Sequence, residues 1–215
     1  MNKFLIIFTI IMGFTSCEEE TEVHFEEPMG KKELTSFDND LIGSYIGELD
    51  SSVIEVGNTW IIHSGTTYFK YSKTLIDSAS HLIFEGNLII DTVENVSYDY
   101  LTDGDSIVFG ENWIDTIFNI SYNQLLMKDN KRYYLNYNEG ADWIVRTLDV
   151  DKAILKIGRL KIDSLKLVHQ YTEVSRDTLD NGEIDHHIIS PTKKEFKKIM
   201  KSDVFEYDQE YLKNK

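Results

Sequence analysis

The sequence predicts an all-β protein, built as an antiparallel sandwich, meander or barrel, with one α-helix near the C-terminus. From Leu41 onward, short runs of β-branched and aromatic residues alternate with turn residues at intervals of about 8–12 residues. Between Leu41 and Glu183 no segment has the apolar spacing of a sustained helix. Regular short strands without intervening helices indicate an antiparallel sheet.

Each predicted strand is bounded by turn chemistry. In order, the strands are Leu41–Leu49, Val53–His63, Thr67–Tyr71, His81–Ile90, Asn95–Leu101, Ser106–Phe109, Trp113–Ile120, Gln124–Met127, Arg132–Tyr137, Trp143–Val150, Ala153–Ile157, Lys161–Glu173 and Glu183–Ile189. The turn signals between them include Asp103-Gly104, Gly110, Asn138-Glu139-Gly140, Gly158 and Asp180-Asn181-Gly182. Asn181-Gly182 suits a type I′ hairpin, because both residue types tolerate positive φ.

One C-terminal segment, about residues 191–201, has the signature of a helix. Ser190 is a good N-cap residue, and Pro191 fits the first helical position. The apolar residues that follow have i, i+3, i+4 spacing and predict one face packed on the sheet. They are Phe196, Ile199 and Met200.

The N-terminus carries a targeting signal. Lys3 precedes Phe4–Phe14, an apolar run of eleven residues. That is the length of the apolar part of a signal peptide and well short of the ~20 residues needed to span a bilayer. We therefore expect residues 1–16 to be a signal peptide.

The only cysteine, Cys17, stands at the expected cleavage point, after Phe14-Thr15-Ser16. This order of a large apolar residue, a variable one, a small one and cysteine resembles the lipobox of bacterial lipoproteins. The resemblance implies a diacylglycerol group on the Cys17 thiol and an acyl chain, typically palmitate, on its new amine. Such an anchor holds a protein permanently on a membrane. The alternatives are an uncleaved anchor and a plain secretory signal.

An acidic segment follows the cysteine. Residues 17–36 contain seven glutamates and two lysines, which predicts a solvated tether rather than part of a core. Acidic residues directly after the acylated cysteine also resemble the export signal of Bacteroidota-type surface lipoproteins. That resemblance implies the outer membrane and its outer surface, whereas solubility alone is the simpler explanation. Residues 37–215 are then one β-rich domain.

Charge and cysteine content exclude several classes of function. The chain of 215 residues has 22 basic and 37 acidic side chains, a net charge of −15. Nucleic acid is excluded as a partner, because binding phosphates requires a basic patch. A single cysteine cannot form an intramolecular disulfide or a thiolate cluster for a metal.

Two places in the sequence carry candidate metal ligands, although no cofactor is expected. Glu183, Asp185 and His187 alternate along a predicted strand and share one face, with His186 on the other. An exposed polar flank of a hairpin explains the same pattern. Asp103 and Asp105 flank Gly104 and suit calcium, but a plain tight turn accounts for them equally.

Aromatic residues supply the candidate binding residues. Trp60, Trp113 and Trp143, with numerous tyrosines, suffice for a face that stacks on sugar rings or anchors a partner protein. Core and cross-strand packing is the alternative for each tryptophan.

These patterns favour a non-catalytic binding or interaction lipoprotein of the cell envelope, with a protein, peptide or glycan as ligand. No nucleophile elbow, phosphate loop or zinc-protease motif is present. Leu41-Ile42-Gly43-Ser44-Tyr45 resembles the first strand of lipocalin-like barrels, which implies the alternative of a carrier for a small apolar ligand. A hydrolase built from carboxylates and His187 is a further alternative, and an immunity protein against a basic toxin lies within the interaction class.

Overall fold

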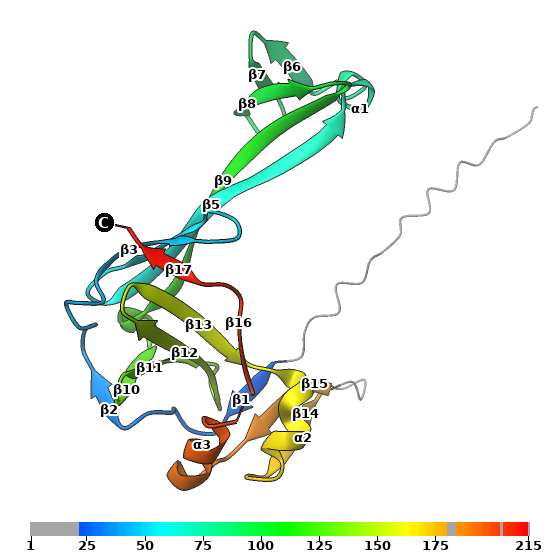
Figure 1. The fold of residues 1–215 in the computed structure, drawn as a ribbon. Coiled ribbons are helices and arrows are strands. Elements are labelled where there is room, and N and C mark those ends of the chain that lie inside the picture. Colours follow the sequence, from blue (N-terminus) through cyan, green and yellow to red (C-terminus); the bar gives the residue numbers. More distant parts are fainter. Residues whose placement is uncertain (1–21, 180–183, 203, 215) are drawn as a thin grey trace, which may run out of the picture.

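A large, open, antiparallel sheet makes up most of the computed structural model, which describes residues 22–179, 184–202 and 204–214 (Figure 1). The antiparallel all-β class is confirmed, since β1 with β15 is the one parallel pairing among the described strands.

Three meanders build most of the sheet. The first contains β3 (Gly43–Gly47), β4 (Val53–Val56) and β5 (Trp60–Ser72). The second contains β6 (Leu82–Glu85), β7 (Leu88–Asp91), β8 (Val96–Asp103) and β9 (Ser106–Asn119). The third contains β10 (Leu125–Asp129), β11 (Arg132–Asn138), β12 (Trp143–Asp151) and β13 (Ile154–Leu160).

The remaining elements join these meanders or flank them. They are β1 (Val23–Phe25), β2 (Lys32–Leu34), β14 (Val174–Thr178), β15 (Ile184–Ile189), β16 (Phe205–Tyr207), β17 (Tyr211–Lys213), α1 (Lys73–Asp77), α2 (Leu165–Val168), α3 (Lys193–Ile199) and the 3₁₀ turns Ile120–Tyr122 and Ile162–Ser164. β17 pairs with β3 on one side and β13 on the other, and so connects the first meander to the third. None of the helices in the described ranges is long and apolar enough to cross a membrane.

Two hydrophobic clusters hold the body of the protein together. The main core gathers fourteen buried side chains, and strands of all three meanders contribute to it; Tyr45 of β3, Phe118 of β9 and Leu135 of β11 are among its fully buried members. Because these strands contribute to one cluster, the sheet curves around it. A second core lies between α3 and the β1, β12 and β15 strands and contains Phe25, Ile189 and Phe196.

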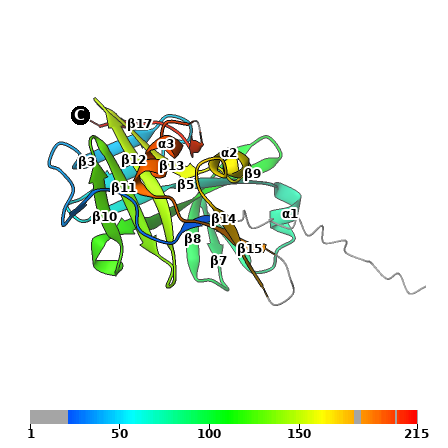
Figure 2. The same ribbon diagram turned by 90° about the horizontal axis from the view of Figure 1, so that it is seen from below.

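The segment after Glu22 belongs to this fold. The prediction that residues 17–36 form a solvated tether is therefore wrong for the part that the structure describes. β1 pairs with both β12 and β15, and β2 pairs with β10. In Figure 2 the blue N-terminal segment runs across the sheet toward β14 and β15. Val23 and Phe25 are buried in the second core, because alternate residues of β1 face it. The many glutamates of this segment obscured an apolar alternation of only three residues.

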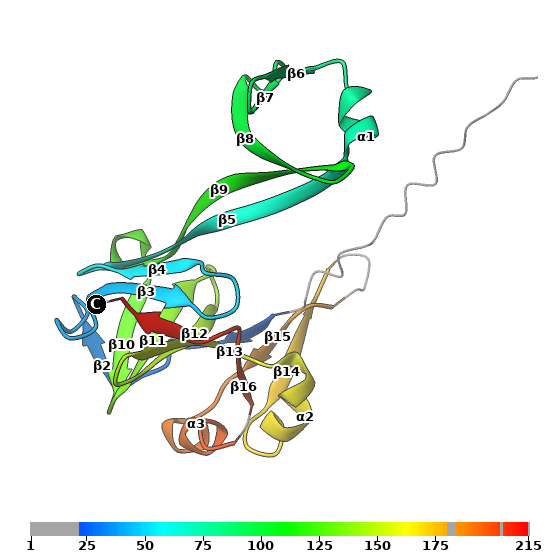
Figure 3. The ribbon, with the colours of Figure 1, turned by 45° about the horizontal axis from the view of Figure 1, so that its top comes forward.

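An arm projects from the body (Figures 1 and 3). β5 pairs with β9 along its whole length, but β4 accompanies β5 only as far as Ser64. Beyond that point, residues 65–113 form a two-stranded ribbon that carries α1 and the β6–β8 hairpins at its far end. A small third cluster, centred on Ile76, Ile89 and Ile107, supports this end.

Glycine explains two errors in the predicted turns. Gly110 and Gly158 lie inside β9 and β13 rather than between strands. A Cβ at Gly110 would approach Thr66 Cγ2 to 2.7 Å, and one at Gly158 would approach Thr147 Oγ1 to 2.7 Å. These glycines permit close packing of cross-strand side chains instead of a chain reversal.

The helices differ from the prediction in position and number. The C-terminal helix is confirmed, but its N-cap is Thr192, which forms a capping box with Glu195. Ser190 instead hydrogen-bonds to Glu26. The prediction of a strand over Lys161–Glu173 is wrong, because α2 and a 3₁₀ turn occupy part of it.

Candidate functional site

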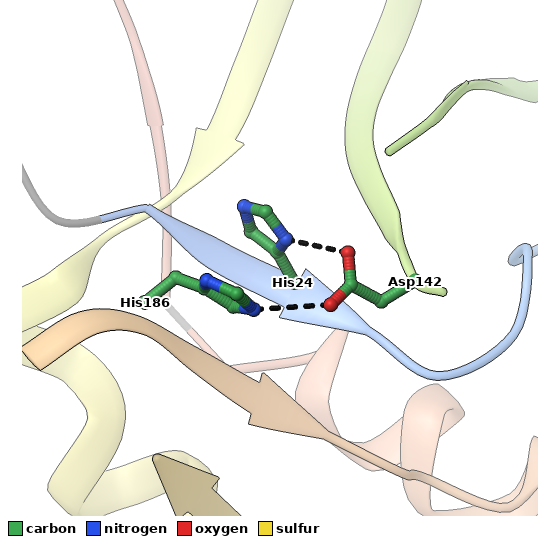
Figure 4. Close-up of side chains that lie close together, drawn as sticks. All are labelled: His24, Asp142 and His186. Atoms are coloured by element: carbon green, nitrogen blue, oxygen red, sulfur yellow. Dashed lines mark hydrogen bonds and ion pairs between the residues drawn. The ribbon is translucent and has the colours of Figure 1, made fainter. Parts of the chain in front are cut away.

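Two histidines and an aspartate meet where β1 lies between β12 and β15 (Figure 4). His24 of β1 stands opposite Ile144 of β12 and Ile188 of β15. Asp142 and His186 come two residues before these partners, so all three side chains lie on the same face of the sheet. We refer to His24, Asp142 and His186 as the histidine–aspartate cluster.

The Asp142 carboxylate is the centre of this cluster. Its Oδ1 lies 2.7 Å from His24 Nδ1, and its Oδ2 lies 3.0 Å from His186 Nε2. The two imidazole rings stack with their centroids 4.0 Å apart. Asp142 is 7% exposed, and the two histidine side chains are 12% and 13% exposed. The cluster is therefore largely shielded from solvent.

Asp185 completes the surroundings of His186. Its Oδ2 lies 2.9 Å from His186 Nδ1, so that ring stands between two carboxylates. Burial lowers the pKa of His186, but hydrogen bonds to Asp185 and Asp142, together with their charges, raise it above its ordinary value. The site thus favours a positive charge on this ring or next to it.

Of the three residues predicted to share a metal site on β15, the two that the structure describes have different partners. Glu183 lies outside the described residues. Asp185 contacts His186, whereas His187 lines a separate cavity with His169. Alternation along the strand predicted that Asp185 and His186 point to opposite faces, yet the Asp185 carboxylate reaches the His186 ring.

The cavity beside His187 has a volume of about 460 Å³. Its lining is mixed: Lys166, Arg176 and His169 are joined by Asp163 and by the apolar side chains of Ile162, Leu165 and Val174. Burial, with Arg176 and His186 nearby, lowers the pKa of His187. His187 Nδ1 is buried and has no hydrogen-bond partner.

Asp103 and Asp105 lie at the β8–β9 turn. Gly104 between them has a φ of +60°. Asp103 forms an ion pair with Lys70 at 2.6 Å. Neither aspartate belongs to a cluster of three or more metal-ligating side chains within the described residues.

The three tryptophans are half-buried and lie apart. Trp60 covers Gly57, and Trp113 covers Gly65 and packs edge-on against His63 at 4.7 Å. Trp143 packs against the second core. Each therefore packs within the sheet, and none of the three forms a ring pair with another.

Aromatic rings gather instead on the arm. Phe109 of β9 lies 5.6 Å from Phe69, 6.0 Å from Tyr71 and 5.1 Å from Tyr98. Of the four, Phe69, Tyr98 and Phe109 are half-buried and Tyr71 is exposed. This group fastens β5, β8 and β9 to one another on one face of the arm.

The opposite face of the arm exposes apolar side chains beside polar ones. Tyr68 and Leu101 lie on this face by strand register and are 74% and 76% exposed, and Ile114, 78% exposed, continues it at the base of the arm. The Lys70–Asp103 ion pair lies on the same face. Seven of the fourteen large apolar side chains exposed in the described chain belong to residues 65–113. That segment also holds eight acidic side chains against two lysines, or −6 of the total −15.

Sequence reasoning missed His24 and Asp142. They are 118 residues apart, and only the pairing of β1 with β12 brings them together. The alternation Val23-His24-Phe25 within the acidic run was the one signal that could have identified β1. Comparison of the chain with protein-family models, curated proteins and solved structures finds no match.

Proposed function

We propose that this chain is a non-catalytic interaction protein of the bacterial cell envelope, anchored through lipids on Cys17, that holds a partner protein with its arm. The arm is the observation that carries this proposal. Monomeric proteins seldom expose contiguous apolar side chains, and such surfaces mark interaction sites. Here seven exposed apolar side chains lie within one ribbon that leaves the body of the molecule, where they have no neighbouring part of the body to pack against.

The charge of the arm indicates the chemistry of the partner. With a net charge of −6 around the exposed apolar residues, the arm suits a partner whose surface is basic around an apolar centre. Complementary charge accelerates association, and the buried apolar contacts then stabilise the complex. This description includes an immunity protein against a basic toxin.

The double variant Tyr68→Ala, Leu101→Ala is expected to lose its partner. Both side chains lie on the open face of the arm and make few internal contacts, so the fold should persist. Cross-linking in living cells, followed by recovery of the tagged chain, should show a reproducible protein neighbour that falls at least about tenfold in the variant.

The matched control is Leu49→Ala, Tyr122→Ala. These residues are also exposed, at 82% and 65%, but lie outside the arm. The control should recover the neighbour in full. If both double variants recover it equally, the arm is not the binding surface.

A carrier of a small apolar ligand is less well supported. The curved sheet encloses the packed main core, and the cavity beside His187 carries the charged side chains of Asp163, Lys166 and Arg176 among its apolar ones. Burying charged groups against a purely apolar ligand is unfavourable. Recovery of no protein neighbour at all would shift the proposal toward a small ligand or a glycan.

Lipid anchoring makes a separate prediction. Cys17→Ser should abolish the incorporation of labelled palmitate, because the serine hydroxyl is not a substrate for thiol diacylation. Thr15→Ala alters only the variable position of the lipobox and should leave labelling unchanged. Equal labelling of the wild-type chain and Cys17→Ser would exclude the anchor.

A further inference from the structure

We propose that the histidine–aspartate cluster binds one divalent transition-metal ion, with Zn²⁺ as the best fit. His24 Nδ1, His186 Nε2 and one Asp142 oxygen are the ligand atoms. This inference is independent of the function of the arm, because the cluster lies at the pairing of β1 with β12 and β15, in the body of the protein.

The positions of the ligand atoms are the first argument. One ligand atom from each of the three side chains lies within 4.8 Å of the others. Zn²⁺ forms bonds of about 2.0–2.1 Å to imidazole nitrogen and carboxylate oxygen, which places tetrahedral ligands about 3.3 Å apart. The two imidazole nitrogens contact different oxygens of Asp142, His24 Nδ1 at 2.7 Å from Oδ1 and His186 Nε2 at 3.0 Å from Oδ2, so both nitrogens already lie beside the carboxylate that would hold the ion. Because the two rings are stacked and a nitrogen binds a metal through its in-plane lone pair, binding requires the rings of His24 and His186 to turn out of the stack until both nitrogens and one Asp142 oxygen point at the ion.

Proton accounting at His186 is the second argument. A neutral imidazole has one N–H donor, yet both nitrogens of His186 face a carboxylate. One of these contacts is repulsive unless a positive charge is present. A metal ion on Nε2 supplies that charge and leaves the proton on Nδ1 for Asp185.

Asp185 provides the third argument. A histidine that ligates a metal usually donates its other N–H to a carboxylate, which fixes the tautomer and the ring orientation. Asp185 has this relation to His186, at 2.9 Å. It was expected from the sequence to be a ligand, and in this arrangement it positions one.

The ligand types decide between metals. Two imidazole nitrogens and one carboxylate suit Zn²⁺ and its transition-metal neighbours, whereas Ca²⁺ and Mg²⁺ prefer oxygen ligands throughout. Three protein ligands leave a fourth position for water or another group. Bound metal would link β1, β12 and β15, which are distant in sequence.

The test is a metal titration of the full chain carrying Cys17→Ser and no histidine tag, purified in detergent. Zn²⁺ binding is measured by calorimetry at pH about 8, above the ordinary imidazole pKa of about 6.5. Co²⁺ serves as a spectroscopic probe through its visible absorption. We expect one equivalent of metal and a Co²⁺ spectrum typical of four-coordinate nitrogen and oxygen ligation.

Variants assign the ligands. His24→Ala and His186→Ala should each weaken Zn²⁺ binding at least about 100-fold, and Asp185→Asn should weaken it about 10–100-fold. Asp177 forms a second, exposed group with Asp185 and His186, so Asp177→Asn tests that alternative and should have no effect. The control His81→Ala removes an exposed histidine of the arm and should also have no effect.

Several results would overturn the proposal. The first is that the Cys17→Ser chain with His24, Asp142 and His186 unchanged does not bind Zn²⁺. The others are that His24→Ala binds Zn²⁺ as tightly as that chain, or that Asp177→Asn loses the binding. If a ligand variant fails to fold, X-ray absorption spectroscopy of the Zn²⁺-loaded chain still counts the imidazole ligands of the ion and so tests the proposal. Two imidazole ligands support the site, and one or none contradicts it.

Discussion

Replacing Phe25 by alanine is expected to lower the free energy of unfolding by about 3–5 kcal/mol. Phe25 is fully buried in the second core, where its ring packs edge-on against Phe196 with centroids 6.0 Å apart. The substitution removes a large apolar side chain and leaves a cavity between β1 and α3. The unfolding free energy falls for two reasons: the variant no longer gains the free energy of burying the ring, and the side chains around the cavity lose their contacts with it.

Urea denaturation of the full chain measures this effect. The control Glu27→Ala changes an exposed residue of the same segment and should alter stability by less than about 0.5 kcal/mol. Were Phe25→Ala as mild as its control, residues 22–36 would behave as a tether in solution and not as part of the fold.

Replacing Asn136 by alanine is expected to cost about 3 kcal/mol of stability. The Asn136 side chain is fully buried in β11 and connects β11 to the segment after β1. Its Oδ1 accepts a hydrogen bond from the Met29 N–H at 2.7 Å. Its Nδ2 lies within hydrogen-bonding distance of the Met29 and Leu125 carbonyl oxygens, at 3.2 and 3.0 Å. Alanine leaves these backbone groups buried without that partner.

Asn138→Ala is the matched control, because Asn138 ends the same strand in an exposed position and accepts a hydrogen bond only from the Gly140 N–H at 2.9 Å. We expect the midpoint temperature of thermal unfolding to fall by about 6–12 °C in Asn136→Ala and by much less in Asn138→Ala. Equal midpoints would show that the buried hydrogen bonds to Met29 do not hold the N-terminal segment in place.

The strands were predictable because their signal is local. Alternation along Trp143–Val150 predicted β12 almost to the residue, since strand formation depends on which side chains face the core. The prediction failed where the apolar pattern was short or ambiguous. β1 shows only Val23 and Phe25 within an acidic run, and α2 is a single short helix within an apolar segment.

The candidate sites were predictable only in part. The sequence predicted β15 as a strand that carries histidine and aspartate side chains. It did not predict which side chains from other strands meet them. His24 reaches Asp142 through the pairing of β1 with β12, and His186 reaches it through the pairing of β1 with β15. No local pattern specifies such pairings over 118 and 44 residues.

The sequence by itself determined the all-β class, the helix near the C-terminus and the strong acidity, and it predicts the lipid anchor on Cys17. Only the tertiary structure decided that residues after Glu22 join the sheet, that an apolar acidic arm leaves the body, and that three distant side chains form one cluster. The physical reason is the range of the forces involved. Side-chain alternation and turn chemistry act within a few residues, whereas strand register is set by the burial of whole faces against partners elsewhere in the chain.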